Sequence, residues 1–261
     1  MTEEINVGAM NEADTPAPRS FFARLSGVYF SPGEAFREIG ISPRVLAPIA
    51  AIVIIGLIVG VCLTQKLDLA SMLADQFERQ ASEGRMSAAQ QAQLQQQMAI
   101  VSRVIGIFIL VLAGISSLIL SLIVAGLFKL VSAMIGAENQ FKAVFTVTLY
   151  SILATSIISS TIFVLVLFIK DPRDITFQNM NSLVSSNLGS IIALLAGENA
   201  LPKFLMGLAR SVDLFAIWMI ALLAIGYSAV SKKLRTSTAA TWLVACYAVV
   251  AVIGALIGSF R

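Results

Sequence analysis

The sequence contains no histidine among its 261 residues, so it cannot build a histidine-based triad, acid–base relay or metal site. Charge is scarce as well: 13% of residues are charged, whereas an ordinary soluble domain has about 25%. The two cysteines, Cys62 and Cys246, fall inside apolar runs, where a thiol is usually a small buried hydrophobe, and we infer neither a disulfide nor a metal pair. These shortages exclude a histidine-dependent enzyme and argue against a soluble domain.

Common enzyme motifs are missing too. There is no G-x-S-x-G elbow, no G-x-x-x-x-G-K-[ST] phosphate loop, and no carboxylate pair inside the apolar segments that could act as acid and base. The net charge of +3 is spread over the flanks of the apolar segments, which is a topology signal and not a nucleic-acid-binding patch. We therefore expect no enzyme activity, no cofactor and no nucleic-acid partner.

The first 18 residues are polar and contain Pro16 and Pro18, so we expect a disordered tail over 1–18. This stretch has neither the basic n-region nor the apolar h-region of a secretory signal peptide. We therefore expect the first membrane-spanning helix to direct insertion.

Hydrophobic residues make up 57% of the chain and are concentrated in five uncharged windows. Each window supplies the ~17–25 residues that an α-helix needs to cross roughly 30 Å of hydrocarbon. We therefore predict an all-α, polytopic membrane domain over 45–261, in the lipid bilayer. Its five transmembrane helices are expected at about 46–65, 103–129, 143–169, 212–231 and 238–259.

Residues 19–44 predict two short helices before the first span. In the first, Arg19 to Phe30, apolar residues recur on one helical face with Arg24 beside it. This pattern fits an interfacial helix in the membrane or a helix packed on the protein's own spans. The fold class we predict includes the interfacial form.

The second short helix is predicted from the segment SPGEAFREIG. Ser31 and Glu34 have the spacing of a capping box, and Pro32 takes the first helical position. Gly40 ends the helix shortly before the first span.

A polar segment between the first two spans predicts an extramembrane helical hairpin. Apolar residues recur at three or four positions from Leu63 to Ala81, so the first spanning helix is predicted to continue to about Ser82. Gly84 interrupts the pattern, and the glutamine-rich segment 88–100 then leads helically into the second span. A second capping box, formed by Ser87 and Gln90, is expected to start this arm.

The window from Ile175 to Gly197 lacks charge but is rich in serine and asparagine. Its apolar part, Leu188 to Ala196, is too short to cross a membrane. We predict an interfacial or re-entrant helix within 171–210, and a sixth span is the alternative.

Two charged residues open spans at the same membrane face. Arg103 begins the second span and Asp213 begins the fourth, and alternating topology places both on one side. A charge pair would lower the cost of carrying either residue into the interface. The alternative is that each side chain extends into water on its own.

The third span is rich in hydroxyl groups, among them Tyr150 and Ser156. They could line a polar path through the bilayer. Serine and threonine hydroxyls can equally bond to carbonyls of their own helix or to a neighbouring helix.

Two G-x-x-x-G spacings lie in the first and last spans, formed by Gly56 with Gly60 and by Gly254 with Gly258. Such a pair leaves one helix face free of side chains and allows close helix approach. We expect either packing sites inside the bundle or the interface of a homo-oligomer.

Three segments together resemble the Yip domain family of five-span membrane proteins: YFSPGEAFREIG at 29–40, GAENQFKAVFTVTLYSIL at 136–153 and VDLFAIWMIALLAIGYSAVSKK at 212–233. The residues that carry most of the resemblance are Pro32, Phe36, Gly136, Phe141, Tyr150, Trp218 and Gly226.

The resemblance implies a cytoplasmic N-terminus, which the charge count does not decide because nine basic residues fall on each side. Eukaryotic members engage prenylated small GTPases during vesicle transport. This chain lacks their D-L-Y-G-P-type element and looks more like the prokaryotic branch, for which no defined activity is implied. A prokaryotic plasma membrane is therefore the expected location.

From these observations we expect a membrane scaffold or adaptor that recruits protein partners through its N-terminal helices or its hairpin. The alternative is a transporter, channel or lipid-handling protein that uses the polar face of the third span against the fourth. Trp218 and Asp213 would then line its entrance.

Overall fold

The computed structural model describes residues 20–67, 88–172, 175, 183–197 and 199–259. Within these ranges, it describes only the backbone for residues 88–100 and Arg103. Every regular element in these ranges is a helix, which confirms the predicted all-α class. In chain order the helices are α1 (Phe21–Phe30), α2 (Pro32–Ile41), α3 (Leu46–Lys66), α5 (Ala88–Met134), α6 (Phe141–Ile169), α7 (Leu188–Ala196), α8 (Lys203–Ser211), α9 (Leu214–Val230) and α10 (Thr236–Ser259). The predicted tail over 1–18 lies outside the described residues.

Four of the described helices are long and apolar enough to cross a membrane: α3, the Val104–Met134 part of α5, α6 and α10. α9 is apolar but has only 17 residues. A helix of that length is about 25 Å long, somewhat less than the ~30 Å of a hydrocarbon core. The fourth of the five predicted spans falls on this shorter helix.

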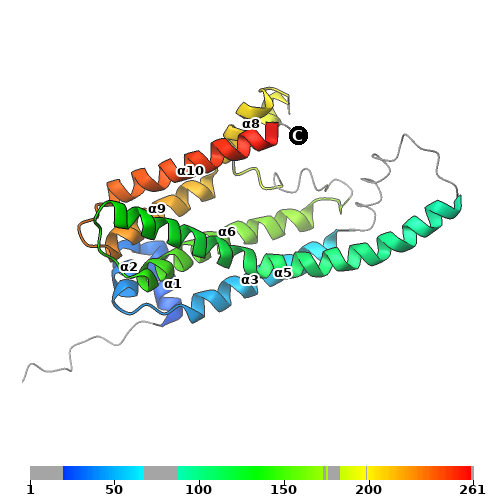
Figure 1. Ribbon diagram of the computed structural model, residues 1–261. Coiled ribbons are helices and arrows are strands. Elements are labelled where there is room, and N and C mark those ends of the chain that lie inside the picture. Colours follow the sequence, from blue (N-terminus) through cyan, green and yellow to red (C-terminus); the bar gives the residue numbers. More distant parts are fainter. Residues whose placement is uncertain (1–19, 68–87, 173–174, 176–182, 198, 260–261) are drawn as a thin grey trace, which may run out of the picture.

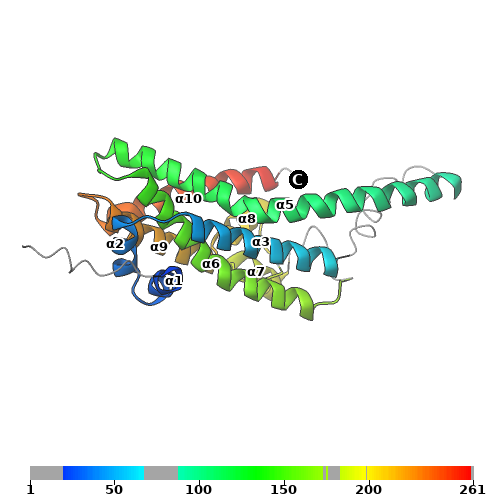
Figure 2. The same cartoon turned by 90° about the horizontal axis from the view of Figure 1, so that it is seen from below.

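The helices form an elongated bundle (Figure 1). α3 packs on α5 and α6, α6 packs on α9, and α9 packs on α10 (Figure 2). α1 and α2 lie at one end, against α6 and α9, whereas α8 lies on α10 toward the other end. The α1–α2 pair and α8 therefore lie toward opposite ends of the bundle.

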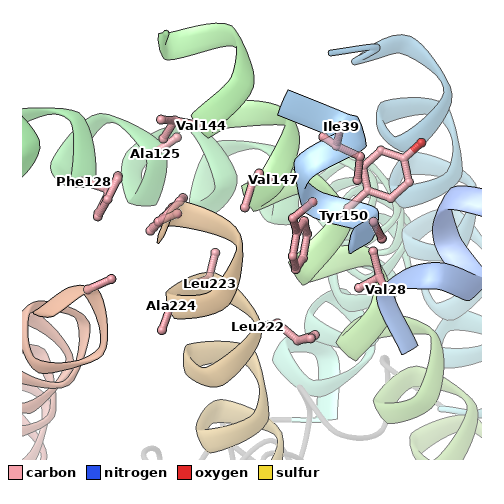
Figure 3. Packing of buried hydrophobic residues seen from close by; sticks show 14 of the residues in the cluster. Val28, Ile39, Ala125, Phe128, Val144, Val147, Tyr150, Leu222, Leu223 and Ala224 are labelled. Carbon is pink, nitrogen blue, oxygen red and sulfur yellow. The ribbon is translucent and has the colours of Figure 1, made fainter. Parts of the chain in front are cut away.

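The main core lies where α1 and α2 meet α6 and α9 (Figure 3). Val28 of α1, Ile39 of α2 and Val147 of α6 are fully buried there. Lipid solvates apolar side chains well, so helices in a bilayer associate mainly through close van der Waals packing. A tight fit therefore matters more than apolar character in this core.

The start of α2 differs from the sequence prediction. Pro32 takes the first helical position as expected, but the Ser31 side chain makes no capping hydrogen bond, so the predicted capping box is wrong. Ser31 instead ends α1, because its backbone N–H donates to the Gly27 carbonyl oxygen at 2.8 Å. Its backbone conformation is set by the preceding helix, and α2 runs one residue past Gly40.

The first spanning helix is shorter than the periodicity predicts. α3 ends at Lys66, and Leu67 adopts an extended conformation instead of continuing the helix toward Ser82. Leu67 is 5% exposed and packs in a small core with Leu167 and Ile175. Leu67 therefore lies against the end of α6, and the remainder of the predicted first arm, 68–87, lies outside the described residues. α5 is a single helix from Ala88 to Met134.

Gly56 and Gly60 lie on the face of α3 that packs against α5. A methyl group added at Gly56 would overlap the backbone at Ala113. At Gly60 it would lie 3.2 Å from Leu110 Cδ2. The close approach of these two helices therefore depends on the missing side chains.

We predict that Gly56→Ala destabilises the protein by about 1–3 kcal/mol, since α3 and α5 must move apart to admit the methyl group. The matched control is Gly126→Ala in α5, where an added methyl group meets no atom within 4 Å. That change should be neutral or stabilise by up to about 1 kcal/mol through helix propensity. Thermal unfolding of both variants in detergent tests this, and equal behaviour of the two would contradict the packing role of Gly56.

Candidate functional site

A buried arginine joins the two N-terminal helices. Arg24 of α1 is 1% exposed, and its Nη1 and Nη2 atoms donate to the Ser42 carbonyl oxygen at 2.8 Å and to Ser42 Oγ at 2.6 Å. Its Nε lies 3.2 Å from Glu38 Oε1 of α2. Charge-assisted bonds of this kind are stronger than neutral ones, so they fix the angle between α1 and the end of α2.

The sequence prediction placed Arg24 beside the apolar face of its helix, and the structure places it within the packed interior. Of the two interpretations of this helix, packing on the protein's own spans is the one observed, because α1 contacts α6. A position in the membrane interface stays a prediction. The signal in the sequence was the spacing: Arg24 follows Phe21 by three residues and precedes Val28 by four, on the same helix face.

Aromatic side chains attach α1 to the spans. The rings of Phe21 and Tyr150 lie 6.0 Å apart, and those of Tyr29 and Trp218 lie 5.9 Å apart. The Tyr29 hydroxyl also donates to the Ala154 carbonyl oxygen at 2.8 Å. Burial raises the pKa of the Tyr29 phenol. Tyr150 and Trp218, two candidates from the sequence, therefore hold α1 on α6 and α9.

Gly226 sets the distance between α9 and its neighbours. A methyl group at this position would overlap Val147 of α6 and lie 3.2 Å from the ring of Phe36 of α2. Phe36 is fully buried. Next to this contact, Tyr227 stacks on Phe128 of α5 with ring centres 3.7 Å apart. One glycine therefore allows α2, α6 and α9 to meet.

The loop before α6 joins the two halves of the bundle at the same end. Gly136 has a φ of +67°, which a glycine adopts without strain and which turns the chain out of α5. Asn139 then accepts two hydrogen bonds from Lys129 Nζ, at its carbonyl oxygen (2.6 Å) and at Oδ1 (3.0 Å). Its amide donates to Ser231 Oγ at 3.2 Å. The family-like segment at 136–140 is therefore a structural connection.

The hydroxyl groups of the third span are mostly bonded within α6. Thr146 and Thr155 donate to carbonyl oxygens four residues earlier, at 2.7 and 3.1 Å. Thr148 does the same and also shares a 2.7 Å hydrogen bond with the Tyr227 hydroxyl. These three threonines are buried, whereas Ser156 is half-buried. The buried part of this face is packed against neighbouring helices.

Asp213 acts as the N-terminal cap of α9. Its Oδ1 accepts hydrogen bonds from the backbone N–H groups of Phe215 at 2.9 Å and Ala216 at 3.0 Å, and its Oδ2 accepts one from Ser186 Oγ. A carboxylate at a helix N-terminus is stabilised by the helix dipole. The backbone of Arg103 lies in α5, and its side chain is outside the described atoms, so the proposed pair with Asp213 stays a prediction.

The two cysteines lie in different surroundings. Among the described residues, no group of three or more histidine, cysteine, aspartate or glutamate side chains could hold a metal ion. Cys62 is half-buried. Cys246 is exposed on α10, so the burial that its apolar surroundings predicted is wrong. An exposed apolar surface of this kind is normal for a helix in contact with lipid.

An all-helical chain with several helices long and apolar enough to cross a bilayer is a multi-pass integral membrane protein. This chain belongs to the Yip1 domain family, whose sequence profile matches residues 26–258. The match confirms the resemblance to this family that the segments 29–40, 136–153 and 212–233 indicated. Comparisons with the curated proteins and with the solved structures found no match.

We predict that Arg24→Ala lowers the free energy of unfolding by about 3 kcal/mol, because it removes a fully buried side chain together with its hydrogen bonds to Ser42 and its ion pair with the partly buried Glu38. Arg37→Ala on the exposed face of the same helix pair is the control and should change stability by less than about 0.5 kcal/mol. Thermal unfolding gives the magnitude, and hydrogen exchange should rise mainly in α1 and α2. Equal effects of the two substitutions would refute the structural role of Arg24.

Proposed function

We propose that this protein is a five-span membrane scaffold whose N-terminal helix pair, α1 and α2, binds a protein partner. The observation that carries the proposal is the outward face of this pair. Phe22, Phe30 and Ile41 are 77%, 88% and 85% exposed, although they belong to helices whose other faces are buried. Large apolar side chains left exposed on a helix pair that otherwise packs on the bundle mark a candidate interaction surface.

Charged residues on the same helices support a protein partner over lipid tails. Glu34 and Arg37 of α2 are both exposed. Placing them in hydrocarbon would be costly, so this face is expected at the membrane boundary or in water. Apolar side chains beside charges in that position resemble a protein-binding surface, with an apolar centre and a polar rim.

The docking of α1 and α2 supports a pre-formed surface. Arg24 joins the two helices, and Phe36 is fixed against Gly226. A surface held in its binding conformation loses little conformational entropy when a partner binds. The helix pair is therefore suited to recruitment without prior folding.

The five-span topology in this proposal depends on α9. At the start of α9, the backbone N–H of Leu214 donates to the Ser186 carbonyl oxygen. Just after α9, the backbone N–H of Lys232 donates to the carbonyl oxygen of Glu138, which precedes α6. These attachments support a helix that runs from one end of the bundle to the other. With five spans, the N-terminal helices and the basic cluster at 232–235 share one side, which we assign to the cytoplasm.

The recruitment surface can be tested by placing a photoreactive amino acid at Phe30 or Ile41 in the full-length protein in its native membrane. Irradiation should give discrete protein adducts at these positions. Leu122 of α5, which is 54% exposed on a spanning helix, is the control and should give lipid adducts. Lipid adducts alone at all three positions, or an adduct of twice the mass of this chain, would refute recruitment of a different protein.

The alternative, a water-filled path along α6, has a separate test. Cysteines at Thr148, Ser156 and Thr161 are treated with a polar thiol reagent in a background that lacks Cys62 and Cys246. Because Thr148 is buried and hydrogen-bonded to Tyr227, we expect no reaction there without denaturant. Rapid reaction at both Thr148 and Ser156 would favour a transport pathway.

A further inference from the structure

A groove of about 620 Å³ lies between α8 and α10, at a distance from the N-terminal helices (Figure 1). One continuous face of α10 forms its floor, with residues recurring at three and four positions. These residues are Tyr247, Val250, Ala251, Gly254, Ala255 and Gly258. The groove therefore includes the second G-x-x-x-G spacing of the sequence.

The two helices are held together at defined points. A methyl group added at Gly207 of α8 would lie 3.1 Å from Ala255 Cα, so the backbones are close there. The Tyr247 hydroxyl donates to the Ser211 carbonyl oxygen at 2.8 Å. By contrast, a methyl group at Gly254 or Gly258 would meet no atom within 4 Å. These two glycines pack against no described part of the chain and leave the groove open.

The wall formed by α8 is basic. Lys203 in its first turn and Arg210 in its last turn both line the groove and are both exposed. They are seven residues apart, which places them on one helix face at a separation of about 10 Å along the axis. The groove thus combines two cations with an apolar floor that continues into the exposed surface of α10.

We propose that this groove binds one anionic phospholipid. The phosphate group contacts Lys203 in the positive field that Arg210 strengthens, and an acyl chain lies along α10 over Gly254 and Gly258. A basic wall beside an apolar floor at the end of a membrane bundle matches the two parts of such a lipid. Arg210 already has another interaction, so the direct phosphate contact is assigned to Lys203.

An apolar helix from a second copy of the chain fits this groove less well. It would cover Lys203 with apolar surface, and burying a cation without a counter-charge is costly in a membrane. A phosphate supplies that counter-charge. The lipid site is separate from α1 and α2, so it does not depend on the proposed scaffold function.

The test uses the full-length protein in detergent with phosphatidylglycerol and phosphatidylcholine of the same acyl chains, and native mass spectrometry to count bound lipid. The protein should retain phosphatidylglycerol in preference to phosphatidylcholine. Lys203→Gln should lower its retention about fivefold, the effect expected for one cation near a headgroup, and leave phosphatidylcholine unchanged. Lys170→Gln, an exposed lysine outside the groove, is the control and should have no effect.

A second variant tests the apolar floor. Gly254→Leu should fill the groove and abolish retention of phosphatidylglycerol, whereas Gly126→Leu on open surface of α5 should not. Helical circular dichroism and size-exclusion profiles verify that each variant is folded. Equal loss in Lys203→Gln and Lys170→Gln, no preference for the anionic lipid, or full retention in Gly254→Leu would each overturn the proposal.

Discussion

The close contact of α2, α6 and α9 at Gly226 is the constraint on which the rest of the structure depends. Within a bilayer, apolar side chains lose little by remaining in lipid, so helices associate where their surfaces approach most closely. Gly226 has no side chain, and Phe36 and Val147 fill the space beside it. This contact places α2, and α2 places α1 through Arg24. The geometry of the N-terminal surface therefore originates in one position of α9.

Polar groups in this bundle are mostly bonded to the protein itself. Thr148 and Tyr227 share a hydrogen bond between α6 and α9, and Asp213 caps the helix that contains Tyr227. Each bond removes a cost that an unpaired polar group would have in hydrocarbon. Along the buried face of α6 the threonines are bonded in this way, whereas the buried Ser151 hydroxyl has no hydrogen-bond partner.

The two ends of the molecule offer different chemistry. At one end, α1 and α2 present aromatic and aliphatic side chains next to charges, a combination suited to a protein surface. Toward the other end, α8 and α10 enclose a groove with a basic wall and an apolar floor, a combination suited to a lipid. A scaffold with both would connect a bound partner to the lipid composition of its membrane.

The sequence by itself determined the all-helical class, the apolar windows and the family, because hydropathy and short motifs are properties of the local chain. It also pointed to Tyr150 and Trp218 through the resemblance, without their contacts. Tertiary structure decided that Arg24 is buried, that Leu67 ends α3, and that Gly254 and Gly258 border a groove while Gly56 and Gly60 pack on α5. Both glycine pairs have the same spacing, so only the rotation of each helix relative to its neighbours separates them. That rotation depends on contacts between residues far apart in the chain, which no local pattern contains.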